Sequence, residues 1–395
     1  MVMALLVIAL YAMLILADVL PPDLTVIVAL AVLGLLILIN CMFASRYKWK
    51  RIVGIVLSLV FVVMMGFVTN FMWDTYSMMA KMSKSSMSAV GPIAKSVDVT
   101  EEPFNIYLTG IDQWEEEKGL DLERSDVNMI LTVNPVTKKV LLTSIPRDTY
   151  VKLHTAQKMD KLTHTGVYGV DETLNTVEDW LGIDLNYYVK MNFTAAQKII
   201  NAIDGIAVYS PVAFDSSLKP YRYKKGWNAL GGKEALYFAR ERKAFEGQDS
   251  IRVENQQRVL KAIIKKMTRR DVLLTKYGKI MSVAGDNIST NMPASDMTDL
   301  AKMQLTDLSE WDIQTQKVTG TYDMDYVASL TQAHKFSVYK ADYKSVRKCL
   351  TAINDVMEPS RSVIANAERN KSRSFVVNVV RSAIERVKGG ADKDE

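Results

Sequence analysis

The charged side chains at the two ends of one stretch, residues 124–148, have the chemistry of a metal and phosphate site. The stretch RSDVNMILTVNPVTKKVLLTSIPRD holds two apolar runs joined by the turn-forming segment NPVTK, which predicts a β-hairpin. Folding the hairpin about Val136 would bring residue 126 opposite 146 and its charged ends to one edge of a sheet. The groups that would meet there are Arg124, Asp126, Arg147 and Asp148. Guanidinium groups pair with phosphate oxygens and carboxylates bind divalent cations, so a site for a metal and a phosphorylated ligand is one interpretation, and a salt-bridged surface hairpin is the other.

A second group of charged and polar side chains lies about a hundred residues later. Arg240 and Arg242 are two residues apart and would point about 200° apart on a continuous helix, so sharing a ligand requires the helix to end near Ala239. Arg252 and Gln256 are four residues apart and share one face of a predicted helix. The alternative interpretation of these residues is a solvated basic helix.

Three uncharged apolar runs occupy the amino-terminal part, at residues 1–17, 24–45 and 52–73. A run of 22 residues spans about 33 Å as a helix, which is enough to cross a bilayer core. Basic residues gather at 45–51, whereas 17–24 holds none. The positive-inside rule therefore predicts three transmembrane helices within residues 1–73, with the amino terminus in the cytoplasm and the rest of the chain outside.

The part of the chain predicted to lie outside alternates strand and helix patterns. Residues 74–103 are polar and small, which is typical of a stalk or linker. Over 104–270 we predict an α/β or α+β domain with a central mixed β-sheet flanked by helices. Residues 271–356 are expected either to extend that domain or to form a small appendix, and residues 357–395 to form a mobile or amphipathic tail. The individual elements predicted are strands at 104–110, 184–192 and 312–323, and helices at 171–182, 193–205, 251–268, 294–305 and 343–356.

Composition removes several classes of function. The net charge is +5, of which +2 comes from the first 73 residues, so no global positive field argues for nucleic-acid binding. Two cysteines, Cys41 and Cys349, exclude a disulfide framework, and the three histidines show no metal-ligand spacing. Anion binding must therefore come from a local cluster of cations.

Six motifs, in order, resemble the LytR–CpsA–Psr family of Gram-positive bacteria, and most closely its capsule-associated members. They are LTGID (108–112), RSDVNMILTVNP (124–135), LTSIPRDTYVKL (142–153), DKLTHTGVYG (160–169), the GG-x-EALYFARER segment (231–242) and D-x-x-R-x-x-x-Q (249–256).

The resemblance implies a multi-pass protein of the cell membrane with a large extracellular transferase domain. It implies transfer of a glycopolymer, of the capsule or teichoic-acid type, from a polyprenyl-pyrophosphate carrier to peptidoglycan through a phosphodiester. Further partners expected are the membrane and other capsule or wall-assembly proteins. By motif position, Mg²⁺ (or Mn²⁺) would be held by Asp112 and Asp126. Asp249 or Asp148 could act as the general base, and either could instead orient an arginine. The residues that would surround the pyrophosphate are Arg124, Arg147, Arg240, Arg242, Arg252 and Gln256.

Elementary chemistry supports this assignment, and two other functions remain open. Mg²⁺ prefers one or two carboxylates plus phosphate oxygens and water, and guanidinium groups keep their charge at working pH. One alternative is a non-catalytic binder that regulates assembly of lipid-linked polymer. The other is a polyprenyl-pyrophosphate pyrophosphatase, in which water is the acceptor.

Overall fold

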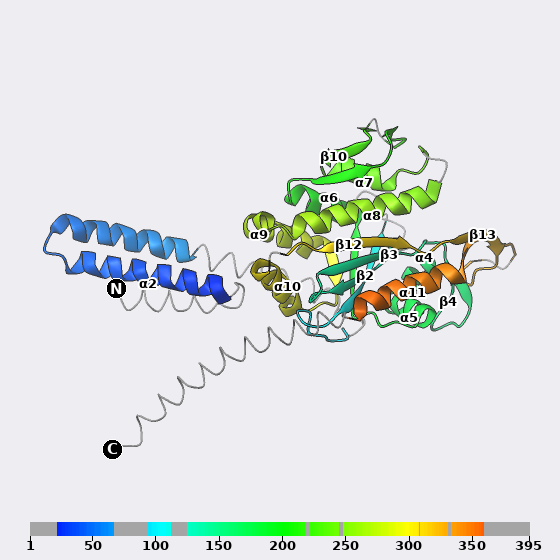
Figure 1. Cartoon of the computed structure of the whole chain (residues 1–395), viewed down its shortest axis with the longest axis horizontal. Coiled ribbons are helices and arrows are strands. Elements are labelled where there is room, and N and C mark those ends of the chain that lie inside the picture. The colour runs from blue at the N-terminus through cyan, green and yellow to red at the C-terminus, as the bar shows by residue number, and fades with distance from the viewer. Residues whose placement is uncertain are drawn as a thin grey trace, which may run out of the picture.

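Two apolar helices form the amino-terminal part of the computed structural model, which describes residues 22–66, 94–111, 125–218, 221–244, 248–307, 309–330 and 333–358. Helix α2 (Pro22–Ala44) is followed by the helix Lys48–Gly66, and the two lie side by side (Figure 1). They pack through Leu36, Phe61 and Met65. Most of their other apolar side chains are exposed, as a surface that faces lipid would be.

One helix in the described part of the chain, Lys48–Gly66, is long and apolar enough to cross a membrane. Leu30–Ala44, the part of α2 whose side chains are described, is a shorter apolar helix. The first predicted span, residues 1–17, lies outside the described residues. The three-span arrangement therefore stays a prediction.

A six-stranded mixed sheet forms the centre of the large domain, in the order β11-β6-β1-β2-β3-β12. Its strands are β1 (Phe104–Ile111), β2 (Ser125–Asn134), β3 (Lys139–Ser144), β6 (Tyr187–Asn192), β11 (Ile288–Thr290) and β12 (Asp312–Lys317). Strand β1 runs parallel to β6, β3 runs parallel to β12, and β2 is antiparallel to both β1 and β3. The predicted mixed α/β fold is confirmed.

Helices cover both faces of this sheet (Figure 1). One side carries α6 (Phe193–Ala202), α7 (Gly232–Arg240), α8 (Gln248–Met267) and α9 (Arg270–Asn287), and the other carries α5 (Val170–Leu181) and α11 (Tyr343–Met357). Helix α10 (Ala294–Thr306) follows β11. The predicted helical period of α5 is confirmed, because Leu174, Val177 and Leu181 are buried, and the helix ends at Gly182, whose φ of 67° suits glycine.

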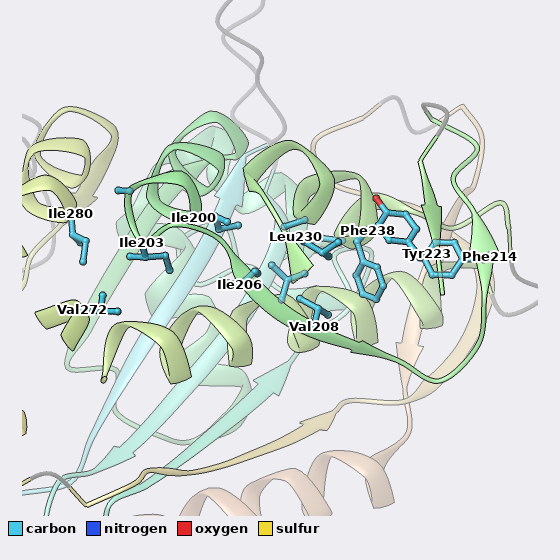
Figure 2. Close-up of a cluster of buried hydrophobic side chains, with 14 residues drawn as sticks. Ile200, Ile203, Ile206, Val208, Phe214, Tyr223, Leu230, Phe238, Val272 and Ile280 are labelled. Carbon is cyan, nitrogen blue, oxygen red and sulfur yellow. The ribbon is translucent and has the colours of Figure 1, made fainter. Parts of the chain in front are cut away.

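Small two-stranded units complete the domain. The pairs are β4 (Tyr150–Lys152) with β5 (Met159–Lys161), β7 (Ile206–Ser210) with β10 (Gly226–Leu230), β8 (Phe214–Asp215) with β9 (Arg222–Tyr223), and β13 (Gly320–Asp325) with β14 (Phe336–Ala341). Short helical turns, α4 (Leu162–Thr165) and η1 (Gly166–Tyr168), follow β5. The inner face of the β7–β10 ribbon joins α6 and α7 in one core, where Val208 and Leu230 lie near Ile203 and Phe238 (Figure 2).

The hairpin of β2 and β3 has a register one residue away from the predicted one. Asn134 pairs with Lys139, so the loop holds four residues and its centre falls after Val136 rather than on it. Continued to the end of the hairpin, this register sets residue 126 opposite 147, and the prediction of 146 is wrong. The extra residue is Lys138, which adopts φ 55° and closes the turn.

The region after residue 270 contributes to the main sheet. Strand β11 pairs with β6, and β12 pairs with β3. Residues 271–356 therefore extend the domain. The predicted strand at 312–323 is wrong as a single element, because the chain leaves the sheet after Lys317 and β13 pairs with β14 instead.

Candidate functional site

The candidate site lies at one edge of the central sheet. Strands β1, β3, β6 and β12 run in the same direction, so their carboxyl ends lie together beside the amino end of β2. Loops and helix ends at such an edge form the ligand site in many α/β sheets. Asp126 stands at the start of β2, and Arg147 follows the end of β3 by three residues.

Asp126 is the extra residue of a β-bulge. Gly110 pairs with Val127, but Ile111 pairs with Ser125, so Asp126 has no cross-strand partner in the ladder. Bulges of this kind redirect a side chain and are common beside functional sites. Strand β1 can approach this closely because residue 110 is glycine, since a Cβ there would lie 3.0 Å from Cβ of Val127.

The carboxylate of Asp126 accepts a hydrogen bond from the Arg147 guanidinium. Both side chains are partly exposed, Asp126 to 16% and Arg147 to 30%, so the pair can reach a ligand. The predicted meeting of Asp126 and Arg147 at one sheet edge is thus present. Arg124 and Asp112 lie outside the described residues, and their predicted roles stay predictions.

Arg147 is held in place by its neighbour Asp148 and by residues at and just after the end of β5. Asp148 Oδ2 lies 3.6 Å from Arg147 Nε, and Asp148 Oδ1 lies 3.2 Å from Lys161 Nζ. The backbone amide of Thr163 donates to the carbonyl of Arg147 at 2.8 Å. Asp148 therefore braces the arginine, and Lys161 is a positioning residue that sequence reasoning did not identify.

The DKLTH motif is fixed by a buried carboxylate. Asp160 is fully buried and accepts hydrogen bonds from the backbone amides of Lys161 and Ser329, both at 2.7 Å, and faces His164 Nδ1 at 2.7 Å. Burial alone would raise the pKa of Asp160, but the hydrogen bonds, led by that with His164, lower it below its ordinary value. Ser329 Oγ also lies 2.8 Å from His164 Nδ1. A nucleophilic triad uses both ring nitrogens, whereas here one nitrogen faces both groups, so this cluster is structural.

The second arginine cluster begins where α7 ends. The helix stops at Arg240, and Glu241 is extended with ψ 130°, so the break that the spacing of Arg240 and Arg242 required is present. The guanidinium carbon of Arg240 lies 5.2 Å from the centre of the Phe193 ring, a cation–π arrangement. Arg242 is exposed in the segment after the helix.

Glu241 fixes this break in the chain, and the sequence analysis missed it. Its carboxylate is fully buried and accepts hydrogen bonds from the amides of Ser217, Arg242 and Ala244 at 2.6, 3.0 and 3.1 Å. Burial alone would raise the pKa of Glu241, but hydrogen bonds, those from Ser217 first, lower it below its ordinary value. The sequence feature that could have indicated it is an acidic residue between two arginines. This residue has no ligand role, and its carboxylate accepts hydrogen bonds from several backbone amides.

Helix α8 brings its polar residues into the interior. Arg252 and Gln256 are 9% and 8% exposed, so the alternative of a solvated basic helix is wrong for this face. Gln257 Nε2 donates to Ser144 Oγ at 2.9 Å, which docks the helix on the end of β3 just before Arg147. This contact sets α8, which carries Arg252 and Gln256, beside the carboxyl end of β3. The side chain of Asp249, in the first turn of α8, is not among those described.

An apolar cavity of about 90 Å³ lies between the sheet and helices α6, α7 and α8. Its walls include Leu108, Val127 and Met129 from the sheet, and Phe193 and Gln256 from the helices. Small residues keep it open, namely Gly110, Ala196, Ala235 and Ala239. Val127 directly follows Asp126 in the chain, and Phe193 lies under Arg240, so each cluster is next to a residue of the cavity wall.

The described residues contain no group of three or more His, Cys, Asp or Glu side chains that could hold a metal ion. Mg²⁺ needs fewer protein ligands, because it keeps water and shares oxygens with a bound phosphate. Asp126, whose carboxylate is partly exposed, is a hard oxygen donor of the kind that such a cation binds, whereas Asp112, its predicted partner, lies outside the described residues.

Comparison with known proteins defines the class of protein to which this fold and site belong. The LytR_cpsA_psr family model matches residues 66–354, and the chain belongs to this family. Polyisoprenyl-teichoic acid–peptidoglycan teichoic acid transferase TagU of Bacillus licheniformis is 32% identical over 260 residues, which cover 65% of this chain and 83% of TagU.

Solved structures show the same similarity. The crystal structure of B. subtilis TagV matches with a TM-score of 0.53 and 29% identity, over 66% of this chain and 99% of TagV. A structure of TagT bound to LIIa-WTA matches with a TM-score of 0.53 and 27% identity, over 68% of this chain and 98% of TagT.

Proposed function

We propose that this chain is a membrane-anchored extracellular phosphotransferase. It would move a glycopolymer, capsular polysaccharide or teichoic acid in type, from a polyprenyl-pyrophosphate carrier onto peptidoglycan through a phosphodiester. The observation that carries the proposal is an apolar cavity whose wall residue Phe193 contacts Arg240 and whose wall residue Val127 directly follows Asp126, the partner of Arg147. Such a site suits a ligand with an anionic head and an apolar tail. The names of the relatives, which act on polyisoprenyl-linked teichoic acid, support this ligand class.

The tail would enter between the sheet and helices α6 and α8. A volume of about 90 Å³ holds roughly three water-sized groups, so a polyprenyl chain would require the helices to move apart. The described lining residues have few polar groups to satisfy, because Asn192, Gln197 and Gln256 are the only amide side chains among them. Widening the cavity therefore exposes apolar surface that the lipid itself covers.

The head would lie among the guanidinium groups. In the proposed reaction an acceptor hydroxyl attacks the phosphorus that carries the polymer, a new P–O bond forms, and the bond to the bridging oxygen breaks. Polyprenyl phosphate leaves, and the hydroxyl proton passes to a base. Arg147 and Arg240 would stabilise charge that grows on the leaving phosphate, and Arg252 and Gln256 would orient it.

Asp148 is engaged with Arg147 and Lys161, which leaves Asp249 as the proposed base. Asp126 uses Oδ1 to hold Arg147, and its second oxygen, with Asp112, would hold Mg²⁺ or Mn²⁺. The cation would neutralise charge on the pyrophosphate oxygens.

The membrane anchor is proposed to be the helix Lys48–Gly66 together with the apolar runs before it. The basic segment 45–51 would stay in the cytoplasm, which places the large domain outside. This orientation gives the site access to both lipid-linked polymer and the wall.

The proposal is tested with the full chain in detergent, supplied with a polyprenyl-pyrophosphate-linked polymer and peptidoglycan fragments. We expect Arg147→Ala and Arg240→Ala each to lower polymer transfer by roughly 10²–10³-fold, since each removes a group that contacts developing charge. Arg222→Ala is the matched control, because that side chain is 85% exposed on β9. Release of polyprenyl phosphate and polymer bound to peptidoglycan are both measured.

Undiminished transfer in both variants would overturn the proposal. Release of polyprenyl phosphate at the same rate without acceptor would identify a pyrophosphatase. Binding of the lipid with no release under any acceptor would identify a non-catalytic binder.

A further inference from the structure

A second hollow lies on the opposite face of α8. The residues of α8 that line the apolar cavity and those that line this groove are centred about 180° apart around the helix, at 100° per residue. The groove has a volume of about 560 Å³ and is bordered by β12 on one side and by the β7–β10 ribbon on the other. It is therefore separate from the site of the proposed reaction.

The groove is lined with cations. Arg258, Lys261 and Lys265 follow one another along α8 at three and four residues, which spaces them by about 5–6 Å, and Lys317 adds a fourth cation from β12. Among the lining residues that the structure describes, Glu254 is the one carboxylate, and it pairs with Arg258 at 3.1 Å and Lys317 at 2.6 Å. The groove therefore has more positive than negative side chains, and the positive ones are arranged in a row.

Two exposed aromatic rings form its wall on the ribbon. Trp227 and Tyr209 are paired across the strands, 64% and 46% exposed, with ring centres 5.6 Å apart and edge to face. The alternate residues of the same strands, Val208 and Leu230 among them, are buried in the core. The rings are therefore held in place from behind while their own surface stays open to a ligand.

We propose that this groove binds a strand of phosphate-bearing glycopolymer. A row of regularly spaced cations suits a chain whose phosphates repeat, and exposed aromatic rings offer flat apolar surface to sugar rings. This inference rests on the proposed function, in which such a polymer is the group transferred.

The groove ends where the polymer would be needed. Lys317 pairs with Ser144 in the parallel register of β12 and β3, so it lies at the same sheet edge as Asp126 and Arg147. From there the groove runs away along α8 from Glu254 to Lys265, about 16 Å at 1.5 Å per residue. A polymer whose first unit is at the reaction site could continue into the groove, which would favour charged polymers over neutral ones.

The test is binding, measured by calorimetry with the full chain in detergent. The probes are glucosylated poly(glycerol phosphate) and, as a neutral chain, an oligomer of N-acetylglucosamine. We expect the phosphate polymer to bind, and we expect its affinity to fall as the salt concentration rises. Trp227→Ala should weaken it roughly tenfold or more, since exposed aromatic anchors dominate such contacts. Lys265→Gln should weaken it by up to about fivefold.

Matched controls sit outside the groove. Lys266→Gln changes the neighbouring lysine on α8, and Tyr322→Ala removes a ring that is 53% exposed on β13. Unchanged affinity in both groove variants would overturn the proposal, as would binding of the neutral oligomer alone. Arg147→Ala and Arg240→Ala leave the groove intact, so a failure of the transfer assay and a failure of groove binding are distinguishable.

Discussion

On one face of the central sheet, Tyr107 and Ile130 pack in one cluster with residues of α5 and α11. On the other face, Leu108 and Met129 border a cavity beneath α6 and α8. These residues are neighbours on the same two strands and alternate between the faces. Both faces are buried, so burial alone does not distinguish them. The difference lies in the partners, because large side chains fill one face and small residues of α6 and α7 leave the other open.

The comparison separates a face that supplies stability from one that can admit a ligand. On the filled face, close packing means that each methylene contributes van der Waals contacts to stability. Residues beside a void already lack part of these contacts. The charged residues follow the same division. Asp126 and Arg240 lie next to the wall residues Val127 and Phe193 of the cavity, whereas Asp160 and His164 contact each other at the turn α4.

The largest expected effect is on the filled face. Ile130→Ala should lower the free energy of unfolding by about 2–5 kcal/mol, because Ile130 is fully buried and its loss creates a new cavity. Met129→Ala changes the neighbouring residue on the open face. Its loss in the free energy of unfolding should be smaller than that of Ile130→Ala by about 1 kcal/mol or more, since Met129 already borders a void. Denaturant unfolding of the full chain in detergent measures both. Equal losses for the two variants would break the comparison.

A smaller effect is expected at the closed end of the filled face, from Asp160→Asn. The variant loses a charge that His164, Ser329 and the amide of Lys161 stabilise, and we expect a cost of about 1–3 kcal/mol at pH 7.

The same variant should also change the pH dependence of stability. Because the pKa of Asp160 is depressed in the folded chain, its contribution is present above the ordinary value of 3.8 and is lost as pH falls through the folded pKa. The wild-type chain should therefore lose stability more steeply than Asp160→Asn below about pH 4. Unfolding midpoints measured between pH 7 and acid test this, and parallel curves would contradict it.

The smallest effect on stability is expected where the open face is filled. Ala196→Leu adds side-chain volume to the cavity and should change the free energy of unfolding by no more than about 1 kcal/mol. The same variant should weaken binding of a polyprenyl pyrophosphate, because the tail and the new side chain compete for one space. Ala229→Leu, on the outward face of β10, is the control that adds the same volume elsewhere. Unaltered lipid binding in Ala196→Leu would show that the cavity does not receive the tail.

Several features of this protein were already decided by short stretches of its sequence. The alternating run 104–110 became β1, the period of residues 174, 177 and 181 became α5, and the arginine spacing at 240 and 242 required the break that follows Arg240. Six ordered motifs indicated the family that the comparisons then showed. Such features are predictable because strand and helix periods, and the residues that end a helix, act within a few positions.

Other features depended on residues that lie far apart in the chain. The bulge at Asp126 arises from a mismatch between β1 and β2, and the link from Gln257 to Ser144 joins positions 113 residues apart. The sequence left Asp148 open between base and brace, and only its place between Arg147 and Lys161 made it a brace. The hairpin register was missed by one residue because the conformation of Lys138, not the composition of the loop, sets it.

The sequence by itself therefore determined the elements, their order and the charged residues that could bind a phosphorylated ligand. Only the tertiary structure decided which face of the sheet is hollow, that the cavity wall includes Phe193 beneath Arg240, and that a second, basic groove follows the far side of α8. The physical reason is that a cavity or a groove is a property of the space between elements, and that space is fixed by packing across the whole domain rather than by any one stretch of the chain.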